Sequence, residues 1–242
     1  MTAIDLTLGQ RPDEAGPPIA AGPTSYSEEV TARLSADAAQ IIARYPVARS
    51  ALMPILHLVQ SEDGYITRAG VEFCAAQLNL TAAQVSAVAT FYSMYRRTPT
   101  GEYLVGVCTN TLCAVMGGDE ILAELREHLG IAPGETSADG RVTLEHLECN
   151  AACDFAPVVM VNWEFFDNQT PASAVDLIDR LRRGEDVVPT RGPETLPTFR
   201  ENSRVLAGFE DGRADEGGRP GDPSLLGLRI ARENGWTEAL AR

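Results

Sequence analysis

The sequence predicts a protein of the mixed α+β or α/β class in two parts, a bundle of short helices followed by a small α/β domain. Apolar residues recur about every 3.6 positions from Tyr26 to about Met94, and every second position after Pro99. Beyond these parts, residues 184–242 hold nine glycines and five prolines among 59 residues, which indicates a mostly irregular tail. We therefore expect a flexible N-terminal arm over 1–25, a helical bundle over 26–98, the α/β domain over 99–184 and a C-terminal extension over 185–242.

Four short helices are expected in the first part. Apolar residues three and four apart predict helices over 27–44 and 48–60, and Pro54 should kink the second unless it begins late. Thr67 is expected to cap a third helix that ends at Leu78. A fourth helix follows over 81–92, where the first residue and the one three later form a capping box. We expect the aromatic residues near its end to form a core between the two parts: Phe91, Tyr92 and Tyr95.

The second part alternates strands and helices. We expect a helix over 171–183, because Thr170 can cap it, Pro171 suits its first turn and Gly184 suits its end. The remaining expected elements are a strand over 102–107, a helix over 118–129, a strand over 141–147, and a hairpin over 157–162 and 163–166. The order β-α-β-β-α is that of a small thioredoxin-like domain.

Composition excludes two classes of partner. The chain has 20 Lys and Arg against 34 Asp and Glu, a net charge of −14, which opposes binding to nucleic acid or to anionic lipid. No apolar run approaches the roughly 20 residues of a membrane span, and the start shows no basic segment followed by an apolar one. We therefore expect neither membrane insertion nor export by a signal peptide.

Four of the five cysteines form two close pairs, Cys108-x4-Cys113 and Cys149-x3-Cys153, which are separated by 35 residues. Each pair stands where one of the two expected strands ends. Because sites in open α/β sheets gather beyond the carboxyl ends of the strands, the pairs are expected to converge at one edge. Cys74, the fifth, is expected to be a buried apolar residue inside a helix.

Three interpretations of these four thiols remain open. A zinc site commonly uses pairs spaced by two to four residues, so this spacing is at the loose end of that range. A [2Fe–2S] cluster needs loops of small residues whose amides can approach the sulfurs. Threonines, an alanine and two glycines lie within or just after the first cysteine pair, and two alanines lie within the second. Unligated core thiols are the third interpretation. Spacing favours the [2Fe–2S] cluster.

The whole pattern resembles one family. The four cysteines, followed by Asp154-x2-Pro157-Val158, are similar to those of the thioredoxin-like [2Fe–2S] ferredoxin subunits, the bacterial NuoE type, of NADH:quinone oxidoreductase (respiratory complex I). Three upstream segments, 51–60, 64–66 and 88–94, resemble the helical signatures of the same family. The resemblance covers residues 30–183 and does not extend into the tail.

The resemblance implies an electron-transfer subunit with no catalysis of its own. It implies one [2Fe–2S] cluster on Cys108, Cys113, Cys149 and Cys153, which exchanges single electrons with the FMN of an adjacent NADH-binding flavoprotein subunit. An iron–sulfur subunit of the peripheral arm is the other implied partner, on the cytoplasmic side of the membrane. In agreement, the chain has no Gly-x-Gly-x-x-Gly turn and no P-loop for a nucleotide.

Two alternatives to this function stay open. The same module serves NAD-linked hydrogenases and formate dehydrogenases, and a zinc-stabilised adaptor would have no redox role. The sequence also departs from the family at Asn150 and Ala151, where Leu and Gly are frequent, and at Ala114, where a bulky residue is frequent. We expect these changes to affect the reduction potential more than ligation. The apolar stretch 225–236 is expected to dock on the flavoprotein.

Overall fold

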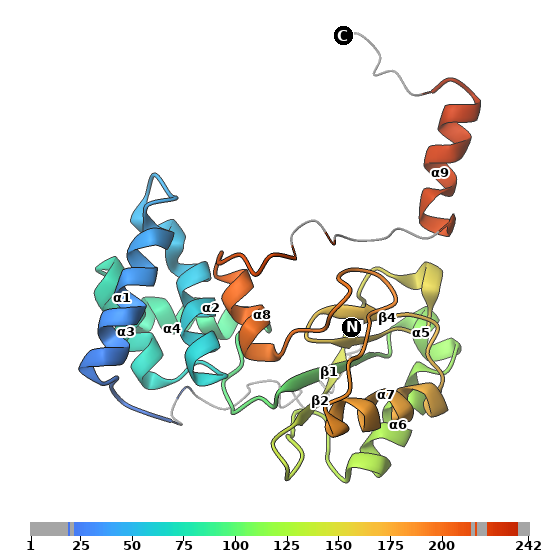
Figure 1. The fold of residues 1–242 in the computed structure, drawn as a ribbon, viewed down its shortest axis with the longest axis horizontal. Helices are drawn as coiled ribbons and strands as arrows, with labels where there is room; N and C mark the ends of the chain where they lie inside the picture. Colours follow the sequence, from blue (N-terminus) through green and yellow to red (C-terminus); the bar gives the residue numbers. More distant parts are fainter. Residues whose placement is uncertain (1–18, 20–21, 214–215, 217–221, 237–242) are drawn as a thin grey trace, which may run out of the picture. The chain divides into compact units, whose positions relative to one another are not determined.

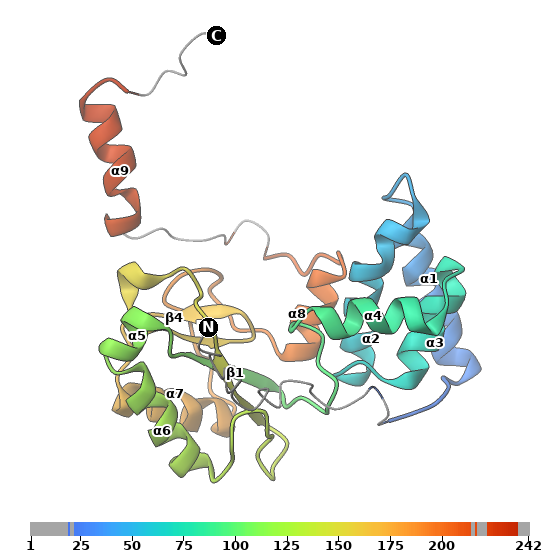
Figure 2. The ribbon, with the colours of Figure 1, turned by 180° about the vertical axis from the view of Figure 1, so that it is seen from behind.

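The computed structural model describes residues 19, 22–213, 216 and 222–236 of the chain. Most of the arm expected over 1–25 lies outside these residues. The chain divides into two compact units, one of residues 1–99 with 206–208 and one of residues 100–205 with 209–242. Figure 1 shows the helices and strands of both units, and Figure 2 shows them from behind.

The first unit is a bundle of four α-helices. They are α1 (Glu28–Ile42), α2 (Leu52–Asp63), α3 (Arg68–Leu78) and α4 (Ala82–Phe91), with a short 3-10 helix, η1 (Ala48–Ala51), before α2. The Thr67 hydroxyl accepts a hydrogen bond from the Gly70 amide, and Thr81 forms the expected capping box with Gln84. These local signals fix the starts of α3 and α4 as the sequence predicts.

Pro54 lies in the first turn of α2, because the segment before it is 3-10 and the α-helix starts late. A proline is tolerated there, since the first amides of a helix have no intrahelical acceptor. The aromatic residues expected to form a core between the two parts do not share one environment, and the contacts of Tyr95 lie inside the first unit. Tyr95 is buried, and its hydroxyl donates to the Met53 carbonyl oxygen at 2.9 Å. Phe91 is 78% exposed, so its assignment to the core was wrong.

The second unit contains a four-stranded sheet in the order β2-β1-β3-β4. The central strand β1 (Tyr103–Cys108) pairs in parallel with β2 (Val142–Leu147) and antiparallel with β3 (Val159–Val161), which forms a hairpin with β4 (Glu164–Phe166). These strands begin within two residues of their expected starts. The mixed pairing leaves β1 at the centre of the sheet.

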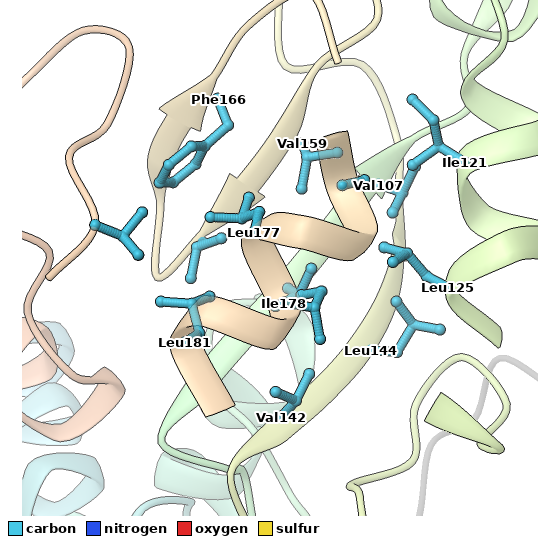
Figure 3. Close-up of a cluster of buried hydrophobic side chains, with 14 residues drawn as sticks. Val107, Ile121, Leu125, Val142, Leu144, Val159, Phe166, Leu177, Ile178 and Leu181 are labelled. Atoms are coloured by element: carbon cyan, nitrogen blue, oxygen red, sulfur yellow. The ribbon is translucent and has the colours of Figure 1, made fainter. Parts of the chain in front are cut away.

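Helices α6 (Gly118–Leu129) and α7 (Pro171–Arg183) lie side by side against the sheet (Figures 1 and 2). Figure 3 shows their apolar side chains and those of the strands meeting in one core. Thr170 caps α7, Pro171 occupies its first position, and Gly184 ends it with a φ of 72°. The boundaries of both helices match the sequence prediction.

The tail is more ordered than the sequence predicts. It contains α8 (Phe199–Leu206) and α9 (Asp222–Glu233). Phe199 is completely buried and stacks on Trp163, with the ring centroids 5.3 Å apart. By contrast, the apolar residues of α9 are exposed: Leu225, Leu226, Leu228 and Ile230. Within the described residues, no helix is both long and apolar enough to cross a membrane.

Candidate metal centre

The two cysteine pairs lie at the same edge of the sheet. Cys108 is the last residue of β1, and Cys149 comes two residues after the end of β2. Because β1 and β2 are parallel and Cys108 stands opposite Leu147, the two chain segments leave the sheet together. The other two cysteines follow on these segments, Cys113 in the short helix α5 (Thr111–Val115) and Cys153 at the start of a 3-10 turn, η2 (Cys153–Phe155).

The four sulfurs come together as two pairs. Cys108 is within hydrogen-bonding reach of Cys113, and Cys149 of Cys153. Cys153 also interacts electrostatically with Cys108 and with Cys113 across the pairs. In the part of the chain that the structure describes, no three His, Cys, Asp or Glu side chains surround a single point as one metal ion requires. Cys74 is buried in α3 of the other unit and takes no part.

Hydrogen bonds tie the two cysteine loops to each other. The Thr109 amide donates to the Leu147 carbonyl oxygen at 3.5 Å, and the Asn110 side-chain amide donates to the Glu148 carboxylate at 3.2 Å. Helix α6 closes on the first loop at Gly118, where a Cβ atom would overlap the carbonyl oxygens of Cys108 and Cys113. Glycine is therefore required for this close approach.

Burial divides the four thiols into two kinds. Cys108 and Cys113 are almost completely buried, whereas Cys149 and Cys153 are exposed. Burial raises the pKa of the Cys113 thiol to about 11, opposed by the Val158 amide and reinforced by the neighbouring Cys108 sulfur. The Cys149 sulfur raises the pKa of Cys153. Cys113 and Cys153 therefore favour their protons unless a cation takes the protons' place.

Backbone amides point at two of the sulfurs. The Ala151 amide lies 3.3 Å from the Cys149 sulfur, and the Val158 amide is hydrogen bonded to Cys113. Ala151 has a φ of 54°, in the left-handed region where glycine is favoured. An alanine there costs about 1 kcal/mol. This backbone shape is kept even though the sequence lacks the glycine that is frequent in the family.

One buried donor in the site has no protein acceptor. The side-chain nitrogen Nδ2 of Asn150, between the third and fourth cysteines, is buried without a hydrogen-bond partner. Because an unsatisfied buried N–H group is costly, such a donor points to an acceptor that completes the site. A cluster sulfur is such an acceptor. The four thiols, the two amides and this orphaned donor fit an iron–sulfur cluster.

Two features of the site were missed from the sequence. The side chains on and after α5 make an exposed apolar rim beside Cys113, formed by Leu112, Val115 and Met116. In addition, Arg191 from the tail lies against Phe155, two residues after Cys153. The sequence shows these three apolar residues on either side of Cys113, but only the structure shows that they are exposed. The contact of Arg191 had no sequence signal, because it joins segments that are far apart along the chain.

Comparison with known proteins places the chain in a family. The profile of the thioredoxin-like [2Fe-2S] ferredoxin family matches residues 38–182. The E-type subunit of the NADH-quinone oxidoreductase of Mycobacterium tuberculosis is 63% identical over 233 residues, which cover 96% of this chain and 92% of that protein. NADH-quinone oxidoreductase subunit 2 of Thermus thermophilus is 38% identical over 149 residues, which cover 60% of this chain and 82% of that protein.

A solved structure adds the fold. An NAD⁺-reducing [NiFe]-hydrogenase is similar with a TM-score of 0.50 and 21% identity over 55% of this chain and 23% of that chain. The profile match confirms the expectation of a thioredoxin-like fold and the resemblance on which it was based. From the match over residues 38–182 and the 63% identity to the mycobacterial protein, this chain belongs to the thioredoxin-like [2Fe–2S] ferredoxin family.

Proposed function

We propose that the chain is the electron-transfer subunit of an NADH:quinone oxidoreductase and holds one [2Fe–2S] cluster on Cys108, Cys113, Cys149 and Cys153. The observation that supports this most strongly is the meeting of two cysteine pairs at one sheet edge. The 63% identity to the M. tuberculosis protein over nearly the whole chain supports the same function. When bound, the cluster accepts and releases one electron at a time.

Charge accounts for the ionisation of the thiols on binding a metal group, and the pairing of the sulfurs favours a binuclear cluster over zinc. Two ferric ions and two sulfides have a net charge of about +2, which offsets part of the charge of four thiolates. That positive charge favours the ionised form of Cys113, whose pKa burial otherwise raises to about 11. A zinc ion takes all four ligands around one point, whereas each iron of a binuclear cluster takes two thiolates, and the sulfurs here are within hydrogen-bonding reach of each other within two pairs. Two pairs suit two iron ions.

The flavoprotein subunit is the proposed electron donor. FMN and NADH belong to that partner, because this chain has neither nucleotide-binding motif. We place the docking surface at the exposed apolar rim, Leu112, Val115 and Met116, which lies in sequence around Cys113. Apolar side chains at this edge would exclude water as they bring the partner close to the exposed Cys149 and Cys153. An iron–sulfur subunit of the peripheral arm is the second proposed partner.

Helix α9 is the proposed second contact with the flavoprotein. Its exposed leucines and Ile230 have no apolar cover, and Trp236 just beyond it is 69% exposed. The tail is shared with the M. tuberculosis relative, whose match covers 96% of this chain, whereas the T. thermophilus match covers only 60%. Such a subunit would be peripheral, on the cytoplasmic side of the membrane, and attached through its partners.

Electron transfer is tested by mixing this chain with the NADH-binding flavoprotein subunit under anaerobic conditions. We expect NADH to reduce the cluster, which is seen as a loss of its visible absorption, only when both proteins are present. Isolation of the chain from its native membranes identifies the parent complex. Co-purification with hydrogenase or formate dehydrogenase subunits, rather than with a quinone reductase, would replace the proposed parent complex by that alternative. A colourless protein with one zinc per chain would overturn the electron-transfer function.

A further inference from the structure

Arg191 contacts two aromatic rings, one of which, Phe155, belongs to the turn that begins at Cys153. Its guanidinium carbon is 5.0 Å from the ring centroid of Phe155 and 4.3 Å from that of Phe165. Its Nη2 donates to the Asp167 carboxylate at 3.0 Å, and the two side chains are only 18% and 7% exposed. The guanidinium is therefore held by stacking and by a largely buried ion pair.

The backbone before Arg191 fixes this position. Thr190 donates from its amide to the Phe165 carbonyl oxygen at 2.9 Å, and its hydroxyl donates to Asp167 at 2.8 Å. The Asp167 amide returns a hydrogen bond to that hydroxyl at 2.9 Å. Arg191 itself pairs with Phe165 as an isolated β-bridge. The tail thus extends the sheet edge at β4 and delivers the guanidinium to one place.

Both rings connect Arg191 to the cysteines. Phe155 ends the short turn that Cys153 begins, and its amide donates to the Ala152 carbonyl oxygen at 3.0 Å. The Phe155 carbonyl in turn accepts from the Asn168 amide at 2.9 Å. Phe165 packs against the buried group that contains Cys108 and Cys113. A side chain that fixes both rings therefore limits the movement of both cysteine pairs.

We propose that Arg191 is a positioning residue for the cluster: it holds Phe155, and through it the turn of Cys153, and its positive charge favours the reduced cluster. This inference rests on the proposed [2Fe–2S] site. Reduction adds one negative charge, which a nearby cation stabilises, although Asp167 offsets part of the effect. The planar stacking between two rings requires a guanidinium, which lysine cannot replace.

The test compares three variants of the full chain with the wild-type protein. Arg191→Met removes the charge and the stacking plane, and Arg191→Lys removes only the plane. Arg204→Met is the matched control, since its guanidinium stacks at 4.2 Å on Phe209, which is far in sequence from every cysteine. Three quantities are measured: the rate of iron release to a chelator, the visible circular dichroism of the cluster, and its reduction potential.

We expect both Arg191 variants to release iron about fivefold faster and to change the circular dichroism, because the Cys153 turn is less constrained. For Arg191→Met, we also expect the reduction equilibrium to become about threefold less favourable, a potential lower by about 30 mV for one electron. Arg191→Lys should keep the potential near that of wild type. Arg204→Met should change none of the three.

The positioning role would be overturned if Arg191→Met released iron at the wild-type rate and kept the wild-type circular dichroism. It would also be overturned if Arg191→Lys matched wild type in both measurements. If Arg191→Met fails to keep a cluster, Arg191→Lys decides the question by the same measurements. The proposed function fails separately, and earlier, if the wild-type chain itself holds no [2Fe–2S] cluster.

Discussion

The side-chain amide of Asn162 donates to the carbonyl oxygen of Pro197 at 2.8 Å and joins the β3–β4 turn to the tail. Asn162 is completely buried, and its Oδ1 accepts from the Leu104 amide at 2.8 Å. Its Nδ2 also donates to the Glu102 carbonyl oxygen at 3.1 Å. One side chain thus forms hydrogen bonds with backbone groups both at the start of the central strand and in the tail. The tail up to α8 is therefore part of the α/β unit.

Replacing Asn162 by alanine should lower the free energy of unfolding by about 3 kcal/mol, because the Leu104 amide and the Pro197 carbonyl lose this buried partner and the Glu102 carbonyl loses one of its two donors. Denaturant unfolding followed by circular dichroism measures this change. Asn234→Ala is the control, since that amide makes one exposed bond within its own helix end, to the Ile230 carbonyl oxygen. Equal stability of the two variants would show that the Asn162 bonds have little weight.

Two parts of the tail are expected to have separate roles, one in folding and the other in binding to the flavoprotein. A chain that ends at Gly184 loses the completely buried Phe199 and the Pro197 carbonyl that Asn162 binds, so we expect it to be strongly destabilised. A chain that ends at Arg213 keeps these contacts and loses the exposed helix α9 with its flanking residues, among them Glu216, whose carboxylate accepts a hydrogen bond from the Glu194 amide. We expect this shorter cut to leave folding and iron content unchanged and to weaken binding to the flavoprotein. Binding as tight as that of the full chain would exclude α9 from the interface.

Cys153→Ala should abolish or severely destabilise the cluster, because no other thiol is placed to replace it. We expect iron content to fall from two per chain toward zero. Cys74→Ala is the matched control, since Cys74 is completely buried in α3 and burial raises the pKa of its thiol. It should keep its iron. Unchanged iron in Cys153→Ala would contradict the ligand assignment.

Asn150→Ala should lower the reduction potential. If the buried Nδ2 donates to a cluster sulfur, its loss removes about 1 kcal/mol of stabilisation from the more negative reduced state, which is about 40 mV for one electron. Potentiometric titration of the visible absorption measures the shift. Asn110→Ala removes an amide from the other loop that already donates to Glu148, so its effect on the potential should be smaller. A larger shift in the Asn110 variant would sink this assignment.

His57 should make stability depend on pH. Burial lowers the pKa of His57 to about 4, and its Nδ1 has no hydrogen-bond partner. The unfolded chain binds a proton at about pH 6.5, so the folded protein is at full stability above that pH and loses stability as the pH falls toward 4. Between pH 8 and pH 5 we expect a loss of about 2 kcal/mol from this group.

The measurement is the unfolding free energy of wild type and His57→Leu across this pH range. The leucine variant should lack the part of the pH dependence that comes from His57. Between pH 8 and pH 5, the unfolding free energy of wild type should therefore fall by about 2 kcal/mol relative to that of the variant. A constant difference would mean that His57 has the same pKa in the folded and unfolded states, so that burial does not lower it.

The sequence predicted those parts of the fold that local signals determine. Capping residues lie next to the helices they start, so Thr67, Thr81 and Thr170 were identified correctly. Convergence of the cysteine pairs was also predictable, because it follows from two strand ends. Helix α8 was missed although Thr198 and Glu201 form a capping pattern, since the surrounding glycines and prolines suggested an irregular chain.

Contacts between distant segments could not be predicted. Helix α5 has only five residues, too few to show a period around Cys113. The buried ion pair of Arg191 with Asp167 and the bonds of Asn162 depend on how the tail returns to the sheet. No spacing of residue types encodes that return. The exposure of Phe91 likewise depends on the packing of the whole helical unit.

The central claim is that this chain holds one [2Fe–2S] cluster on its paired cysteines. The most direct measurement is an electron paramagnetic resonance spectrum of the anaerobically purified protein before and after dithionite, with iron and sulfide analysis of the same sample. We expect no signal before reduction, one reduced [2Fe–2S] signal per chain after it, and two irons with two sulfides. One zinc per chain with no signal after attempted reconstitution with iron and sulfide would contradict the claim.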